Sequence, residues 1–258
     1  MNAATSDKMT SSDPLPEGWR LASTRVLIVA SALVAAFLSF GIGEATHRWF
    51  RPELILQSVI GSAKAMLPTL ETDYAATTRN AAVAFAALGA CLAGALGVAG
   101  GCSRKSVRGA LAGGVGGLLL GGLLGAGISL AVIPSLLRAR YLYSEYEMII
   151  GFVIHGVPWA VIGGASGAAF SLGRGDGRSL GHAVLAGVFG ALIGSIAFDI
   201  LGGLFFASAE IENPISETRL TRFLARLMVG IGTALGLMFS LSPRGPKPIA
   251  GEPPIAAS

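Results

Sequence analysis

Long apolar stretches alternate with short polar ones along the whole chain. Each of six stretches approaches or exceeds the roughly 20 residues that an apolar helix needs to cross a bilayer. They lie at residues 24–43, 81–101, 109–134, 148–172, 182–208 and 223–242. The pattern predicts an all-α fold, a polytopic transmembrane helical bundle of about six spans. The apolar core of the first span is longer than that of a signal peptide, so we expect it to be retained as an anchor.

The connection between the first two spans has its own pattern. Leu56, Val59, Ile60, Ala63 and Met66 recur at helical spacing over a stretch too short to cross the membrane. This spacing predicts an interfacial amphipathic helix within the anchor unit, residues 23–80. The polar segment 1–22 and the proline-rich segment 243–258 are typical of disordered tails.

Composition points to the lipid bilayer as the environment of the chain. Only 13% of the residues are charged and 52% are hydrophobic, whereas soluble domains carry about 25% charged residues. The net charge is +4, but the basic residues are scattered singly among the loops, which does not favour nucleic acid as a partner. The basic residues of the two shortest loops and of the tails favour a cytoplasmic location for those segments. We therefore expect a protein of the cell membrane, such as a bacterial inner membrane, with both termini on the cytoplasmic side. The loop residues are Arg104, Lys105, Arg108, Arg174 and Arg178.

Glycine is the most informative residue type, with 37 in the chain. Many glycines recur every fourth residue and so share one helical face. Small residues let helix backbones approach closely in lipid, where helices gain nothing hydrophobic by associating. We therefore predict helix-packing faces, within the chain or with a homo-oligomeric copy or another membrane protein. The packing positions are Gly109, Gly113, Gly117, Gly121, Gly125, Gly163, Gly167, Gly190, Gly194, Gly232 and Gly236.

The chain also matches itself when shifted by 73 residues. Gly94 then pairs with Gly167 and Gly114 with Gly187, with a basic turn at the same place in both copies. We interpret this as two and a half tandem two-helix repeats: a hairpin at 81–147, a second at 148–221 and a half-repeat helix at 222–242.

The second copy carries a pattern that resembles a known kind of module. A helix with spaced small residues, a basic turn and a glycine-ladder helix are followed by Phe198 and Asp199. This looks like the glycine-zipper modules of bacterial multi-pass membrane proteins that have no assigned activity. The resemblance implies helix packing and no chemistry. The first copy departs from it, because Leu124, Gly125 and Ala126 stand where Phe-Asp would be.

Three ionisable residues lie inside the spans: His155, Asp199 and Arg226. A charged side chain at a helix centre costs about 2.5–3.5 kcal/mol on insertion scales, so such residues usually face a partner or a cavity. His155 and Asp199 each lie 22 residues from Gly177 in the turn that joins their helices, which places them at one depth. We predict a cluster of the three, either a structural pair that holds helices together or an ion, proton or substrate site.

The segment around Ser166, with His182 further on, is similar to the serine segment of rhomboid intramembrane proteases. In that family a whole helix separates serine from histidine, whereas only a turn does here. Cys91 and Cys102 are eleven residues apart on one helix, too far for a disulfide. We expect no catalytic residue, metal or cofactor, and interpret the chain as a non-enzymatic structural or assembly component. The alternatives are a small proton-coupled transporter or channel using Asp199 and His155, and a rhomboid-like protease.

Overall fold

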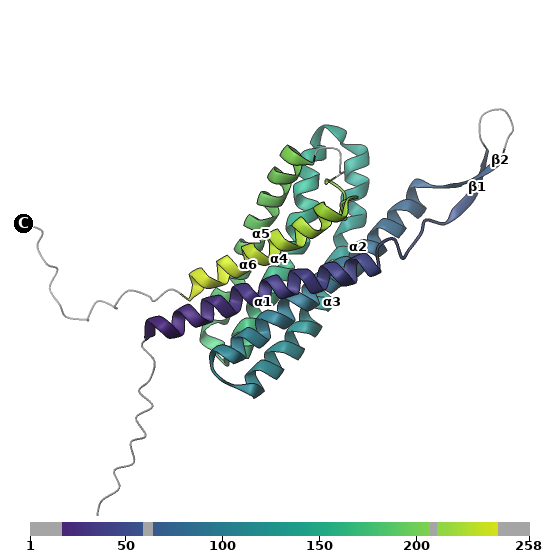
Figure 1. Cartoon of the computed structure of the whole chain (residues 1–258). Coiled ribbons are helices and arrows are strands. Elements are labelled where there is room, and N and C mark those ends of the chain that lie inside the picture. The colour runs from purple at the N-terminus through teal and green to yellow at the C-terminus, as the bar shows by residue number, and fades with distance from the viewer. Residues whose placement is uncertain (1–16, 59–63, 207–210, 242–258) are drawn as a thin grey trace, which may run out of the picture.

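The computed structural model describes residues 17–58, 64–206 and 211–241, and nearly all of them are helical (Figure 1). Each of the six long helices is apolar and long enough to cross a membrane. The predicted class, an all-α polytopic transmembrane bundle, is confirmed. The helices are α1 (Glu17–Ala45), α2 (Leu70–Ser103), α3 (Val107–Leu142), α4 (Glu147–Arg174), α5 (Leu180–Phe205) and α6 (Arg219–Ser240), with single 3-10 turns at η1 (Ser144–Tyr146) and η2 (Gly177–Ser179).

The six helices form a closed arrangement in which the first helix contacts the last. Helix α2 packs on α1, α3 and α4, while α5 packs on α4 and α6. The last helix then returns to the first, and Figure 1 shows α6 beside α1. The six helices alternate in direction. The start of α1 and the end of α6 therefore lie at the same end of the bundle as the α2–α3 and α4–α5 turns. We call this the turn end and the opposite one, near residues 46–69, the hairpin end.

The hairpin end corrects one prediction. The connection expected to form an amphipathic helix contains two strands instead, β1 (Leu54–Ser58) and β2 (Lys64–Pro68), paired antiparallel. Apolar residues stand at consecutive positions here, so they fit a two-residue period as well as a helical one. Five residues including Gly61 separate the strands, which is the hairpin signal that the helical interpretation passed over. Val59, Ile60 and Ala63 of the expected helix lie outside the described residues.

Helix ends also differ from the apolar boundaries. Helix α2 begins at Leu70, well before the apolar stretch, because Thr69 and Thr72 form a capping box in which each side chain bonds the other residue's backbone N–H. Helix α1 begins at Glu17, inside the stretch expected to be a tail. The expected tail at 243–258 lies outside the described residues.

All eleven predicted packing glycines lie against the backbone or side chains of another helix. Gly121 of α3 lies on Gly89 of α2, and Gly190 of α5 lies on Gly232 of α6. A Cβ atom added at any of the eleven would overlap main-chain atoms of the neighbouring helix. The glycine face is therefore occupied inside the monomer, and it is not an outer surface on which a second chain can pack.

The helix contacts in the two hairpins do not show the predicted shift of 73. Gly97 lies on Gly113 in the first hairpin, and Gly167 lies on Ala183 in the second, which is a separation of 70. The turns agree, since Lys105 and Gly175, also 70 apart, both have positive φ. The helix pairs thus share a turn geometry, but the 73-residue tandem repeat is not confirmed.

Candidate polar site within the bundle

The candidate site centres on a buried pair between two helices. His155 of α4 is 1% exposed, and its Nδ1 lies 2.9 Å from Oδ1 of Asp199 on α5. The other ring nitrogen, Nε2, lies 3.0 Å from the backbone carbonyl oxygen of Asn213. The predicted juxtaposition of His155 and Asp199 is confirmed, because equal distances from a turn place residues of antiparallel helices at one depth.

Both ring nitrogens of His155 face oxygen atoms, the Asp199 carboxyl on one side and the Asn213 carbonyl on the other. The ring is thus held between α5 and the segment that precedes α6, and these contacts fix its orientation within the bundle.

Aromatic rings surround the imidazole. The rings of Trp159 and Phe198 have centroids 5.2 and 5.5 Å from that of His155, and both side chains are buried. Trp159 lies one helical turn from His155, with Pro158 between them on α4. The apolar surroundings keep water from the pair and strengthen its electrostatic attraction.

Arg226 does not join this pair, contrary to the prediction of a three-residue cluster. Its Nη1 donates to the Arg222 carbonyl oxygen at 2.9 Å, and its guanidinium lies 5.9 Å from the centroid of the Phe40 ring. Among the described residues no carboxylate oxygen lies within 4 Å of it. Counting residues along the helices predicted the depth of Arg226 in the membrane. It could not predict the rotation of Arg226 about the axis of α6, and the side chain faces α1.

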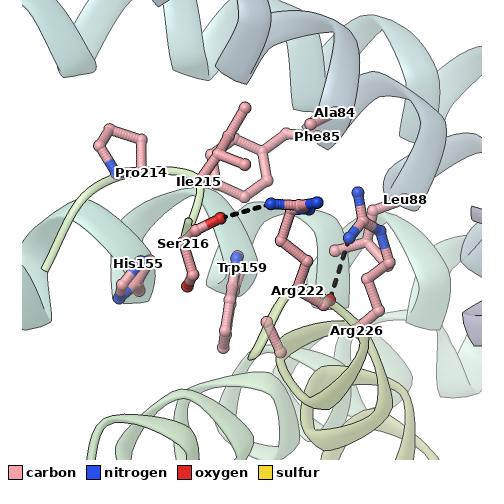
Figure 2. Close-up of a pocket in the computed structure, with 11 residues that line it drawn as sticks. Ala84, Phe85, Leu88, His155, Trp159, Pro214, Ile215, Ser216, Arg222 and Arg226 are labelled. Atoms are coloured by element: carbon pink, nitrogen blue, oxygen red, sulfur yellow. Dashed lines mark hydrogen bonds between the residues drawn. The ribbon is translucent and has the colours of Figure 1, made fainter. Parts of the chain in front are cut away.

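A second buried ion pair joins the first helix to the last. Arg222 donates through Nε and Nη2 to the two carboxylate oxygens of Glu44 at 2.6 and 2.9 Å. Nη1 of Arg222 donates to the Ser216 carbonyl oxygen at 3.0 Å, as Figure 2 shows. The sequence interpretation missed this bidentate pair, although Arg222 and Arg226 are four residues apart and so share a face of α6.

A polar cleft of about 1040 Å³ opens at the hairpin end. Its walls come from the 47–54 segment, the start of α2, the end of α3 and residues 213–217. Arg140 in this wall bonds Glu147, Glu212 and the side chain of Asn213. Burial, reinforced by the charge of Arg222, lowers the pKa of His47, another lining residue.

Ser166 and His182 do not form a catalytic pair. Ser166 is fully buried, and its hydroxyl donates to the Ile162 carbonyl oxygen one turn back on α4 at 2.8 Å. His182 is exposed on α5, so the two side chains lie in different environments. In the described ranges no group of three His, Cys, Asp or Glu residues is arranged to hold a metal ion, and Cys91 and Cys102 are free thiols.

The chain matches no protein-family model, no curated protein sequence and no solved structure. Function must therefore be inferred from the geometry of the bundle, the hairpin and the buried polar groups.

Proposed function

We propose that the chain is a non-enzymatic integral membrane protein that serves as a structural or assembly component, pairing with a second copy of itself through the β1–β2 hairpin. The observation that carries this proposal is the hairpin. It stands apart from the bundle in Figure 1, and apolar side chains are exposed on both of its faces. Leu54, Leu56 and Met66 are 51–56% exposed on one face, while Ile55 and Leu67 are 43% and 42% exposed on the other.

A hairpin of this kind needs a partner. Two isolated strands are marginally stable in water, and each strand has an edge with unpaired N–H and C=O groups that can pair with another strand. A second copy fits best, because antiparallel pairing of identical edge strands about a two-fold axis satisfies both copies at once. The glycine faces are occupied within the chain, so they leave this assembly role to the hairpin.

The proposed location is a bacterial cell membrane with both termini in the cytoplasm. Both ends of the described chain lie at the turn end, together with the short turns that carry Arg104, Lys105, Arg108, Arg174 and Arg178. The excess of Lys and Arg in cytoplasmic loops supports a cytoplasmic turn end.

The oligomeric state of the purified protein tests the assembly role. Light scattering in detergent should give a dimer, and Met66→Cys with Cys91→Ser and Cys102→Ser should cross-link to its own copy. Leu56 and Met66 are opposite each other in the hairpin, so Leu56→Lys with Met66→Lys should shift the dimer to monomer. Tyr143→Lys, at an exposed position near the same end, is the matched control. A monomer at every concentration, or a dimer that survives the double lysine variant, contradicts the proposal.

A second candidate, a small proton-coupled transporter or channel, is favoured by the contact between His155 and Asp199, two side chains able to exchange protons that lie inside the spans. Proteoliposomes loaded with a pH-sensitive dye distinguish the two functions. The structural role predicts proton flux at the level of empty liposomes. Flux that Asp199→Asn abolishes without lowering the melting temperature supports transport instead.

A further inference from the structure

A small, partly open cavity lies beside the polar pair, bordered by α2, α4, α6 and residues 214–216 (Figure 2). Its volume is about 30 Å³. A cavity holds a water molecule once about 10–15 Å³ is available, so this one has room for about two or three water-sized particles. Its polar lining consists of His155, Trp159, Ser216, Arg222 and Arg226.

Two donors in this lining are buried without a hydrogen-bond partner among the residues that the structure describes. They are the indole Nε1 of Trp159, whose side chain is 2% exposed, and the Nε of Arg226, 6% exposed. In Figure 2 the indole nitrogen lies on the side of Trp159 that faces Arg222. A buried donor left unpaired costs about 1–3 kcal/mol, and more when it is charged. Both free groups are donors, so an occupant that accepts hydrogen bonds satisfies them.

The charges around the cavity favour an anion over water or a cation. Glu44 pairs with both Arg222 and Arg219, the latter at 3.3 Å, and His155 faces the carboxyl group of Asp199. Within the described part of the chain, Arg226 has one hydrogen-bond acceptor, the Arg222 carbonyl oxygen, and Glu44, Arg222 and Cys91 are the titratable groups that act on it. These groups leave one positive charge in a buried setting where an unpaired charge is costly.

We propose that this cavity binds one small monovalent inorganic anion of the size of chloride, held by Trp159 Nε1–H and the guanidinium of Arg226. The small volume favours a compact anion. Ile215 lines both this cavity and the polar cleft at the hairpin end, so the segment around Ile215 separates the site from the cleft and the ion enters from that side. The inference does not depend on the assembly role of the hairpin.

Radioactive chloride in equilibrium dialysis tests the proposal directly on the purified full-length protein. We expect one chloride per chain, displaced by bromide and not by gluconate, which is too large for the cavity. The melting temperature should be higher in chloride than in gluconate at equal ionic strength. Absence of stoichiometric chloride binding by the wild-type protein overturns the proposal, whatever the variants do.

Substitutions locate the ion. Trp159→Phe removes the N–H and keeps a ring, and it should weaken chloride binding about tenfold or more, as the loss of a hydrogen bond to a charged group does. Arg226→Leu should abolish the dependence of melting temperature on chloride. Trp49→Phe, at a 70% exposed position outside the cavity, is the control and should bind like the wild type. Chloride binding that survives both Trp159→Phe and Arg226→Leu places the ion elsewhere and overturns the assignment.

Discussion

Gly43 of α1 lies directly against the guanidinium of Arg226 on α6, and a Cβ atom added at Gly43 would overlap Nη2 and Cζ of that arginine. The missing side chain thus makes room for a buried charge near the C-terminal end of α1, where the helix dipole favours a cation. The contact explains why Arg226 turns toward the first helix and not toward Asp199.

Gly43→Ala should therefore displace the guanidinium of Arg226 and lower the melting temperature relative to Gly41→Ala, by less than a clash with backbone would, because the arginine side chain is flexible. Gly41→Ala is the matched control, because a Cβ atom added at Gly41 would meet no atom within 4 Å. Thermal unfolding in detergent measures both. Equal melting temperatures for the two variants would show that Arg226 does not depend on the space at Gly43.

The glycine contact between α2 and α3 makes a similar prediction. A methyl group at Gly121 would meet the backbone of Gly89, whereas one at Gly116 on the same helix would meet nothing within 4 Å. Gly121→Ala should destabilise the fold by about 1–3 kcal/mol, and Gly116→Ala should be neutral or stabilising, because alanine is the better helix former. Destabilisation by Gly116→Ala equal to that by Gly121→Ala would refute the packing assignment.

The His155–Asp199 pair should behave as a coupled unit. Removing one member of a buried pair leaves an uncompensated group, so His155→Ala and Asp199→Ala should each cost about 3 kcal/mol of stability or more. The double variant should cost less than the sum of the two, with a coupling energy of about 0.5–3 kcal/mol. Ile193→Ala, at a 65% exposed position of α5, is the control. Strict additivity would mean that the two side chains do not interact.

Acidification should weaken the fold through His47. Burial lowers the pKa of this histidine in the folded chain, so the unfolded chain binds the proton more readily. The contribution of His47 to stability is full above the unfolded pKa of about 6.5, and it falls as the pH drops through that value toward the lower folded pKa. Between pH 7.5 and pH 5, His47→Gln should lose less melting temperature than the wild type. If the melting temperatures of the two proteins fell equally with pH, His47 would not contribute to the pH dependence of stability.

The two turns at the turn end allow two substitutions that should change the stability of the protein in opposite directions. Lys105 has φ of 54° and Gly175 has φ of 64°, a region that costs a residue with a Cβ about 1–2 kcal/mol. Lys105→Gly should thus stabilise the protein by about 1 kcal/mol, and Gly175→Ala should destabilise it by a similar amount. Denaturant titration checks both. Destabilisation by Lys105→Gly would show that other interactions of Lys105 outweigh its backbone strain.

Much of the fold follows from residue order because membrane spans are specified by length and apolarity alone. The glycines at every fourth position predicted which helix faces meet, and Gly190 does lie on Gly232. The β1–β2 hairpin was missed, since its apolar residues satisfy two periods at once. The 73-residue repeat matched residue types, whereas the contact register follows the turns at Lys105 and Gly175.

The sequence predicted the depth of the candidate site residues in the membrane, but not the side of the helix on which each residue lies. Counting from the α4–α5 turn correctly paired His155 with Asp199, because adjacent antiparallel helices keep one register. Arg226 lies on a helix that joins neither end of that turn, so counting could not give its rotation about its axis. The carbonyl oxygen of Asn213 had no sequence signal, since every residue has one.

The bidentate pair between Glu44 and Arg222 joins the first helix to the last. During synthesis the carboxylate enters the membrane boundary long before its arginine is made, and it stays without that partner until α6 is inserted. A truncated or wrongly inserted chain would keep an orphan charge at this place. The pair therefore forms only once the last helix has been made and inserted, and it closes α6 onto α1 in the finished molecule.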